Sequence, residues 1–131
     1  MAYNDIERAR AEFARTTVNA FALRHKDSAQ SLKKLRTLLR RLPSMLHPGL
    51  IQAAATLAAD SSDAAASAVS DALKKWFEQE SCPVVLPTNQ AQLIDALLEV
   101  KEQPTLWALE REAAQFAGWL KVWVEAQEVG K

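Results

Sequence analysis

The chain has 131 residues, of which 49% are hydrophobic, and its 16 Lys and Arg balance 16 Asp and Glu. A chain of this length can bury about two-thirds of its unfolded surface in one core, without the help of disulfides or metals. Cys82 is the only cysteine, which excludes an intramolecular disulfide, and no apolar run approaches the ~20 residues that a membrane span needs. Since the N-terminus is also polar, without the apolar core of a signal peptide, we expect a cytoplasmic protein with no membrane partner.

The neutral total hides an uneven distribution of charge. Residues 1–50 hold ten Lys and Arg against four Asp and Glu, a net charge of +6, whereas residues 51–131 hold six against twelve, a net charge of −6. Such a dipolar chain could stack head to tail with copies of itself, or touch a polyanion with one half only.

Composition predicts an all-α fold. There are only three glycines, Ala, Leu, Glu, Gln and Lys are abundant, and strand-like alternation is absent. We therefore expect a compact bundle of about six helices that forms a single domain over residues 1–131.

The first helix is expected to begin at Asn4, whose side chain can cap the first amides while Glu7 completes a capping box. A second helix is expected to begin near Asp27 with the same kind of box. It should end at Leu42, because Pro43 disfavours helical conformation in the residue before it.

Four more helices follow in the prediction. The third covers about 48–59 and is rich in alanine, the fourth covers about 63–80, and a short fifth helix follows a cap at Asn89. The sixth runs from about Pro104, which suits the first turn of a helix, to Glu128.

At the 100° per residue of an α-helix, the residues of the second expected helix separate more clearly than elsewhere into an apolar side and a basic side. One side carries five leucines that can bury in a core, and the other offers five cations to a polyanion, although any solvated helix also needs a charged face. The leucines are Leu32, Leu35, Leu38, Leu39 and Leu42, and the cations are Lys33, Lys34, Arg36, Arg40 and Arg41.

A convergent set of catalytic groups is missing from the pattern. His25 and His47 lie in or beside predicted turns, where solvated side chains are the usual outcome. No spacing of His, Cys and carboxylates resembles a zinc or di-iron site, and the three glycines cannot form a phosphate-binding loop. We expect no enzyme activity, no cofactor, no metal and no small-molecule substrate.

Two residues of the last expected helix stand out. Glu112 falls within the apolar stripe, one turn before Phe116, and a buried carboxylate needs a partner. We expect an arginine or a backbone amide to contact it, and Arg10, which borders the apolar side of the first helix, is a candidate donor. Trp107 lies off the stripe and is the best candidate for an exposed aromatic residue.

Three segments in a fixed order point to a family. They are LPSMLHPGL over residues 42–50, REAAQFAGWLK over residues 111–121, and the opening run Arg8–Ala11 followed by Ala14 and Val18. Their order and spacing resemble the small helical subunit of the type III-B CRISPR effector, the Cmr complex.

The resemblance implies a non-catalytic protein that stacks as a minor filament and helps hold guide RNA and target RNA. Its partners would be other subunits of the Cmr complex and copies of itself. Cations that neutralise phosphates without reading bases would form the RNA contact. The candidates for this contact are Arg8, Arg15, Lys33, Lys34, Arg36, Arg40 and Arg41.

Other interpretations remain open at this point. The basic face could meet an acidic partner subunit, which would make the chain a protein-interaction module. A helix-turn-helix DNA-binding regulator is a further alternative, although the alanine-rich third helix lacks side chains that read bases. The small subunit of the type III-A effector is a related possibility.

Overall fold

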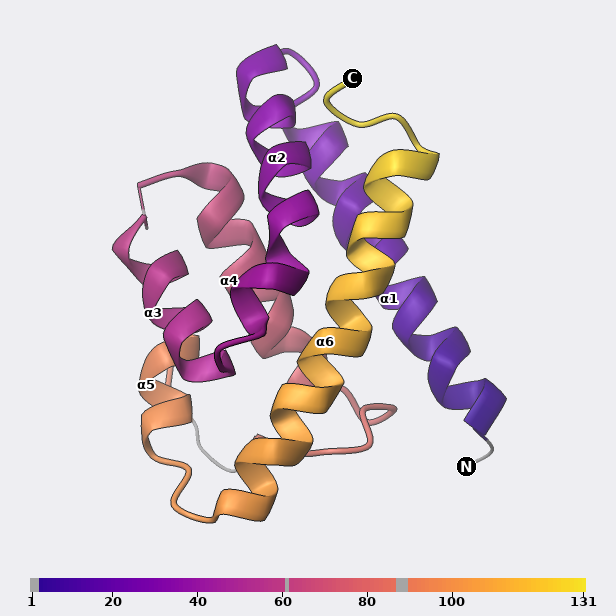
Figure 1. Ribbon diagram of the computed structural model, residues 1–131. Coiled ribbons are helices and arrows are strands. Elements are labelled where there is room, and N and C mark those ends of the chain that lie inside the picture. The colour runs from indigo at the N-terminus through magenta and orange to yellow at the C-terminus, as the bar shows by residue number, and fades with distance from the viewer. Residues whose placement is uncertain (1–2, 61, 87–89) are drawn as a thin grey trace.

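The computed structural model describes residues 3–60, 62–86 and 90–131 (Figure 1). These residues form six α-helices and contain no strand, which confirms the predicted all-α fold. The helices are α1 Tyr3–Arg24, α2 Ala29–Leu46, α3 Leu50–Ala59, α4 Ala64–Phe77, α5 Leu93–Leu98 and α6 Gln103–Ala126.

The long helix α6 joins the two halves of the bundle. It packs against α1 on one side and α2 on the other, and these are the most extensive contacts between helices. Both α1 and α6 run toward the end of the molecule where α2 begins, and α2 returns in the opposite direction (Figure 1). The shorter helices α3, α4 and α5 pack together on the other side of α2.

An aromatic cluster lies where α1, α4 and α6 meet. The rings of Trp76 and Phe116 stack with their centroids 5.6 Å apart, and Phe13 lies 5.6 Å from Trp76 and 5.9 Å from Phe116. Trp76 and Phe116 are almost completely buried. Each large side chain of this kind stabilises the fold by about 1.5–3 kcal/mol relative to its exposed state.

The boundaries of α2 differ from the prediction at both ends. Ser28, not Asp27, caps the helix, and its hydroxyl accepts a hydrogen bond from the amide of Ser31 at 3.3 Å. At the other end α2 continues through Pro43 to Leu46. Proline removes one backbone hydrogen bond, but its exposed ring lies in the last turn, and the added turn buries Leu46 in the core.

Other helix boundaries follow the prediction more closely. The observed ends of α3, α4 and α6 lie within 3 residues of the expected ones. Asp63 caps α4 by accepting a hydrogen bond from the amide of Ala65 at 2.8 Å. The side chain of Asn4 and all of Asn89 lie outside the described residues, and α5 begins after Gln92 without a side-chain cap.

Candidate nucleic-acid interface

The leucine face of α2 is buried, as its periodicity predicted. Leu35, Leu39 and Leu42 are at most 3% exposed, while Leu32 and Leu38 are half-buried at the margins of the face. The cations of α2 therefore lie away from the core, but the structure divides them between two edges of the helix that have different neighbours.

The edge of α2 that faces α6 is occupied by Glu125. Its carboxylate accepts hydrogen bonds from Arg36 Nη2 at 2.7 Å and from Arg40 Nε at 2.5 Å, and Arg36 Nη1 also donates to the carbonyl of Val129 at 3.1 Å. The hydrogen bond from Arg40 is the main cause that lowers the pKa of Glu125. Two of the predicted RNA contacts thus already have an anionic partner inside the chain.

The opposite edge of α2 borders a groove of about 370 Å³, the α2–α3 groove, which α3 and the start of α4 close on the far side. Lys33, Lys34 and Arg41 line its α2 wall, are exposed, and form no ion pair with any described residue. We call these three residues the groove cations. Asp60 and Asp63 lie on the far wall, so the groove has one basic and one acidic side.

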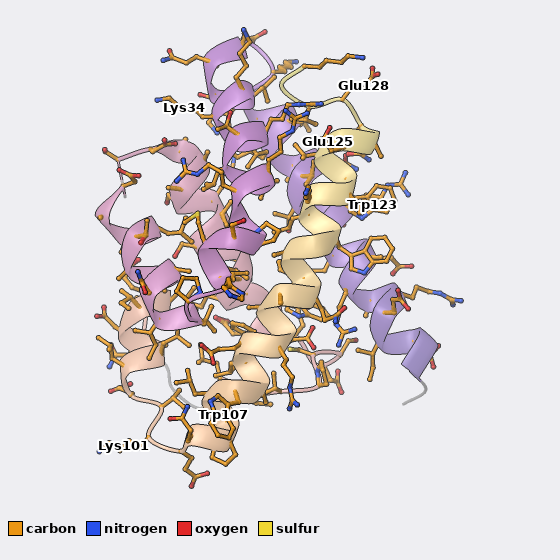
Figure 2. All side chains as sticks on the ribbon, viewed as in Figure 1. Lys34, Lys101, Trp107, Trp123, Glu125 and Glu128 are labelled. Carbon is orange, nitrogen blue, oxygen red and sulfur yellow. The ribbon has the colours of Figure 1, made fainter. Side chains whose placement is uncertain are left out.

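Arg8 and Arg15 belong to a different surface. Both are exposed on α1, and the Arg15 guanidinium lies 5.3 Å from the centroid of the Trp123 ring, a cation–π contact. Trp123 in turn donates a hydrogen bond from Nε1 to the carbonyl of Ala11 at 2.9 Å. Figure 2 shows Trp123 on the side of α6 away from Lys34, so the seven predicted RNA contacts do not form one continuous surface.

The buried carboxylate has the partner that the sequence indicated. Arg10 donates to Glu112 through Nε at 2.5 Å and through Nη2 at 2.6 Å, and the two residues are 8% and 3% exposed. Trp76 Nε1 adds a third hydrogen bond to Glu112 at 2.9 Å. The prediction of an Arg10 contact is confirmed, whereas the role of the Trp76 indole was not anticipated.

The structure also places the cysteine and the two histidines of the chain. Burial raises the pKa of the Cys82 thiol to about 11, so it is protonated at neutral pH and a weak nucleophile. His25 is half-buried, and the centroid of its ring lies 4.3 Å from that of Phe21, whereas a solvated side chain was expected. His47 is exposed, in agreement with the expectation. Among the described residues no group of three or more His, Cys, Asp and Glu could hold a metal ion.

Within the described part of the chain, no helix combines the length and the hydropathy that crossing a membrane requires. The predicted exposure of Trp107 is confirmed at 58%.

A family model described as CRISPR-associated protein (Cas_Cmr5) matches residues 6–127, which include nearly all of α1 and the whole of α2 to α6. No curated protein and no solved structure matches the chain. Because the family match covers almost the entire helical bundle, the chain belongs to the Cas_Cmr5 family and is a small helical subunit of the type III-B CRISPR effector, the Cmr complex.

Proposed function

We propose that this Cmr subunit is a non-catalytic cytoplasmic scaffold that stacks with copies of itself and helps hold guide RNA and target RNA in the assembled effector. The observation that supports the RNA contact most directly is the row of groove cations, which are exposed and have no carboxylate partner among the described residues. Cations of this kind can neutralise phosphates and release counterions without reading base sequence.

The groove cations are better placed for phosphate than the other candidates. Lys34 and Arg41 lie seven residues apart, so they occupy one edge of α2 two turns apart, about 10 Å along the axis. Arg36 and Arg40 must first exchange the carboxylate of Glu125 for a phosphate. Arg8 and Arg15 on α1 would reach a separate stretch of RNA or a neighbouring subunit.

The two ends of the bundle support head-to-tail stacking. The end formed by the close of α1 and the start of α2 exposes Leu23, 71% accessible, and the end formed by α5 and the start of α6 exposes Leu98 at 62% and Trp107 at 58% (Figure 1). The first end is basic, with Arg24, Lys26, Asp27, Lys33 and Lys34, and the second is acidic, with Asp95, Glu99, Lys101 and Glu102. An interface between unlike ends is heterologous, and it produces an open row of copies when the rotation between neighbours does not close a ring.

Several copies in a row would turn weak single contacts into useful avidity. The contribution of each copy would then be positional and electrostatic.

Charge reversal of the groove cations tests the proposal. In the assembled Cmr complex, Lys34→Glu with Arg41→Glu should weaken RNA binding about tenfold or more. The salt dependence should also fall, by about 0.7 in log–log slope for each phosphate of a single strand that the variant no longer neutralises. Arg111→Glu with Lys121→Glu changes the net charge equally at exposed positions that lie outside the α2–α3 groove and away from both ends of the bundle, and serves as the control.

Unchanged RNA affinity and an unchanged salt slope in the groove variant would contradict the RNA contact. That outcome, with loss of a subunit from the complex, would instead indicate that the basic face meets an acidic protein partner. Crosslinking of RNA to residues of α2 in the wild-type complex provides an independent measurement.

A further inference from the structure

The α2–α3 groove has an apolar floor between its charged walls. Leu57 is buried beneath it, and Leu38 and Met45 are half-buried and line the groove. The volume of about 370 Å³ falls within the range of sites that hold small organic ligands. A groove that only followed a phosphate backbone would not need this apolar surface.

The two walls of the groove have opposite charge. A phosphate is attracted by Lys34 and Arg41 on α2 and repelled by Asp60 and Asp63 across the groove. One oxygen of Asp63 accepts the amide of Ala65, and Asp60 is exposed without an ion-pair partner among the described residues. A double helix that lay across the groove would bring its second backbone against these carboxylates.

A single strand fits the same arrangement. Its phosphates can lie along the α2 wall while a base enters the groove, where the thioether of Met45 can form a favourable contact with the aromatic ring of the base. The amino and imino groups of the base are donors, and carboxylates such as that of Asp60 are suitable acceptors.

We propose that the α2–α3 groove binds one unpaired nucleotide of an RNA strand, with its phosphate on the groove cations and its base on the floor formed by Leu38, Met45 and Leu57. The inference rests on the proposed function in taking the strand to be RNA. It adds that the strand is unpaired at this point and that a base, not only a phosphate, is in contact with the protein.

Three probes of equal length separate these contacts on the full-length chain at low salt, with fluorescence anisotropy as the readout. They are an oligouridylate, the corresponding abasic ribose-phosphate strand, and an RNA duplex. The oligouridylate should bind about fivefold more tightly than the abasic strand, the low end of the range for base stacking because the floor is not aromatic. The duplex should bind more weakly than the oligouridylate.

Variants assign the effect to individual residues. Met45→Gln keeps the length of the side chain but makes the floor polar, so it should remove most of the preference for the oligouridylate over the abasic strand. Asp60→Asn removes one charge that repels phosphate, so it should reduce the difference in affinity between the oligouridylate and the duplex. Lys34→Glu with Arg41→Glu should weaken the binding of all three probes, and Arg111→Glu with Lys121→Glu should weaken the binding of none.

An abasic strand that binds as tightly as the oligouridylate would overturn the inference, and so would the absence of oligouridylate binding. If uridine monophosphate competed as well as the oligomer, the groove would be a site for free nucleotide and the inference would also fail. The proposed function survives these results if the groove-cation variant still weakens RNA binding in the assembled complex.

Discussion

Two carboxylates on α6, Glu112 and Glu125, each bind arginine from an N-terminal helix, but under very different conditions. Glu112 is 3% exposed and bound by Arg10 and by the indole of Trp76. The Glu125 side chain is 35% exposed, and its partner Arg40 is 52% exposed.

Because of this difference in solvent access, one arginine–glutamate ion pair holds the fold together and the other can be exchanged. A buried ion pair cannot be opened without leaving a charge in a medium of low dielectric, so the first contact fixes α1 and α4 against α6. An ion pair at the surface contributes little to stability because water and salt compete with it. The second contact can therefore be exchanged for a phosphate with a much smaller loss.

The largest effect is expected for Glu112→Gln. The change leaves the Arg10 charge buried without its carboxylate, so the free energy of unfolding should fall by about 3–5 kcal/mol. Urea denaturation of the variant and of the wild type measures the difference. A loss below about 1 kcal/mol would show that the buried contact is no more important than a surface one.

A double replacement sharpens this result. Arg10→Met with Glu112→Leu removes both charges and retains apolar volume, so it should recover much of the stability that Glu112→Gln removes. If the double variant were as unstable as the single one, then shape and the Trp76 hydrogen bond, not the buried Arg10 charge, would dominate.

A smaller effect is expected for Gly130→Ala. This change tests the C-terminal segment in which the carbonyl of Val129 accepts a hydrogen bond from Arg36. Gly130 has a φ of +75°, and a Cβ added there would lie 2.3 Å from the carbonyl oxygen of Leu32. Alanine should therefore cost about 1–2 kcal/mol of unfolding free energy, measured by thermal or urea denaturation. Gly118→Ala is the matched control, because an added Cβ there meets no atom within 4 Å.

The smallest effect on stability is expected for Glu125→Gln, and it should depend on pH. The hydrogen bond from Arg40 lowers the pKa of Glu125, so its contribution is present above the ordinary glutamate pKa and is lost as pH falls through the lower folded value. The stability difference between wild type and variant should thus shrink toward acidic pH.

The same variant frees Arg36 and Arg40 from their internal anion. RNA affinity at low salt should rise by a fewfold at neutral pH, measured on the same oligouridylate. A fall in affinity would show that Glu125 positions the two arginines for RNA and does not compete with it.

Local pattern predicted the buried contact but not the exposed one. Glu112 stood out because a carboxylate inside an apolar stripe requires a partner, and Arg10 bordered the matching face of α1. Glu125 lies near the end of α6 on a mixed surface, and its contact with Arg36 depends on how α2 and α6 pack. Periodicity within one helix contains no information about that packing.

The same limit explains the division of the cations on α2. Helical periodicity placed Lys34 and Arg40 together on one polar face, and only the positions of α3 and α6 assign them to different edges. It also explains the error at Pro43, since the burial of Leu46 in the core, which favours the last turn, depends on tertiary packing.

The burial of the Trp76 indole should be visible in the fluorescence of the protein. It is stacked on Phe116 and hydrogen-bonded to Glu112, so water reaches it only when α4 separates from α6. Trp107, by contrast, is already hydrated in the native protein. Against the signal of the half-buried Trp119 and Trp123, acrylamide should quench Trp107 in the native protein and Trp76 only on opening of the bundle, so a Trp107→Phe variant separates a signal from the acidic end from one that reports opening.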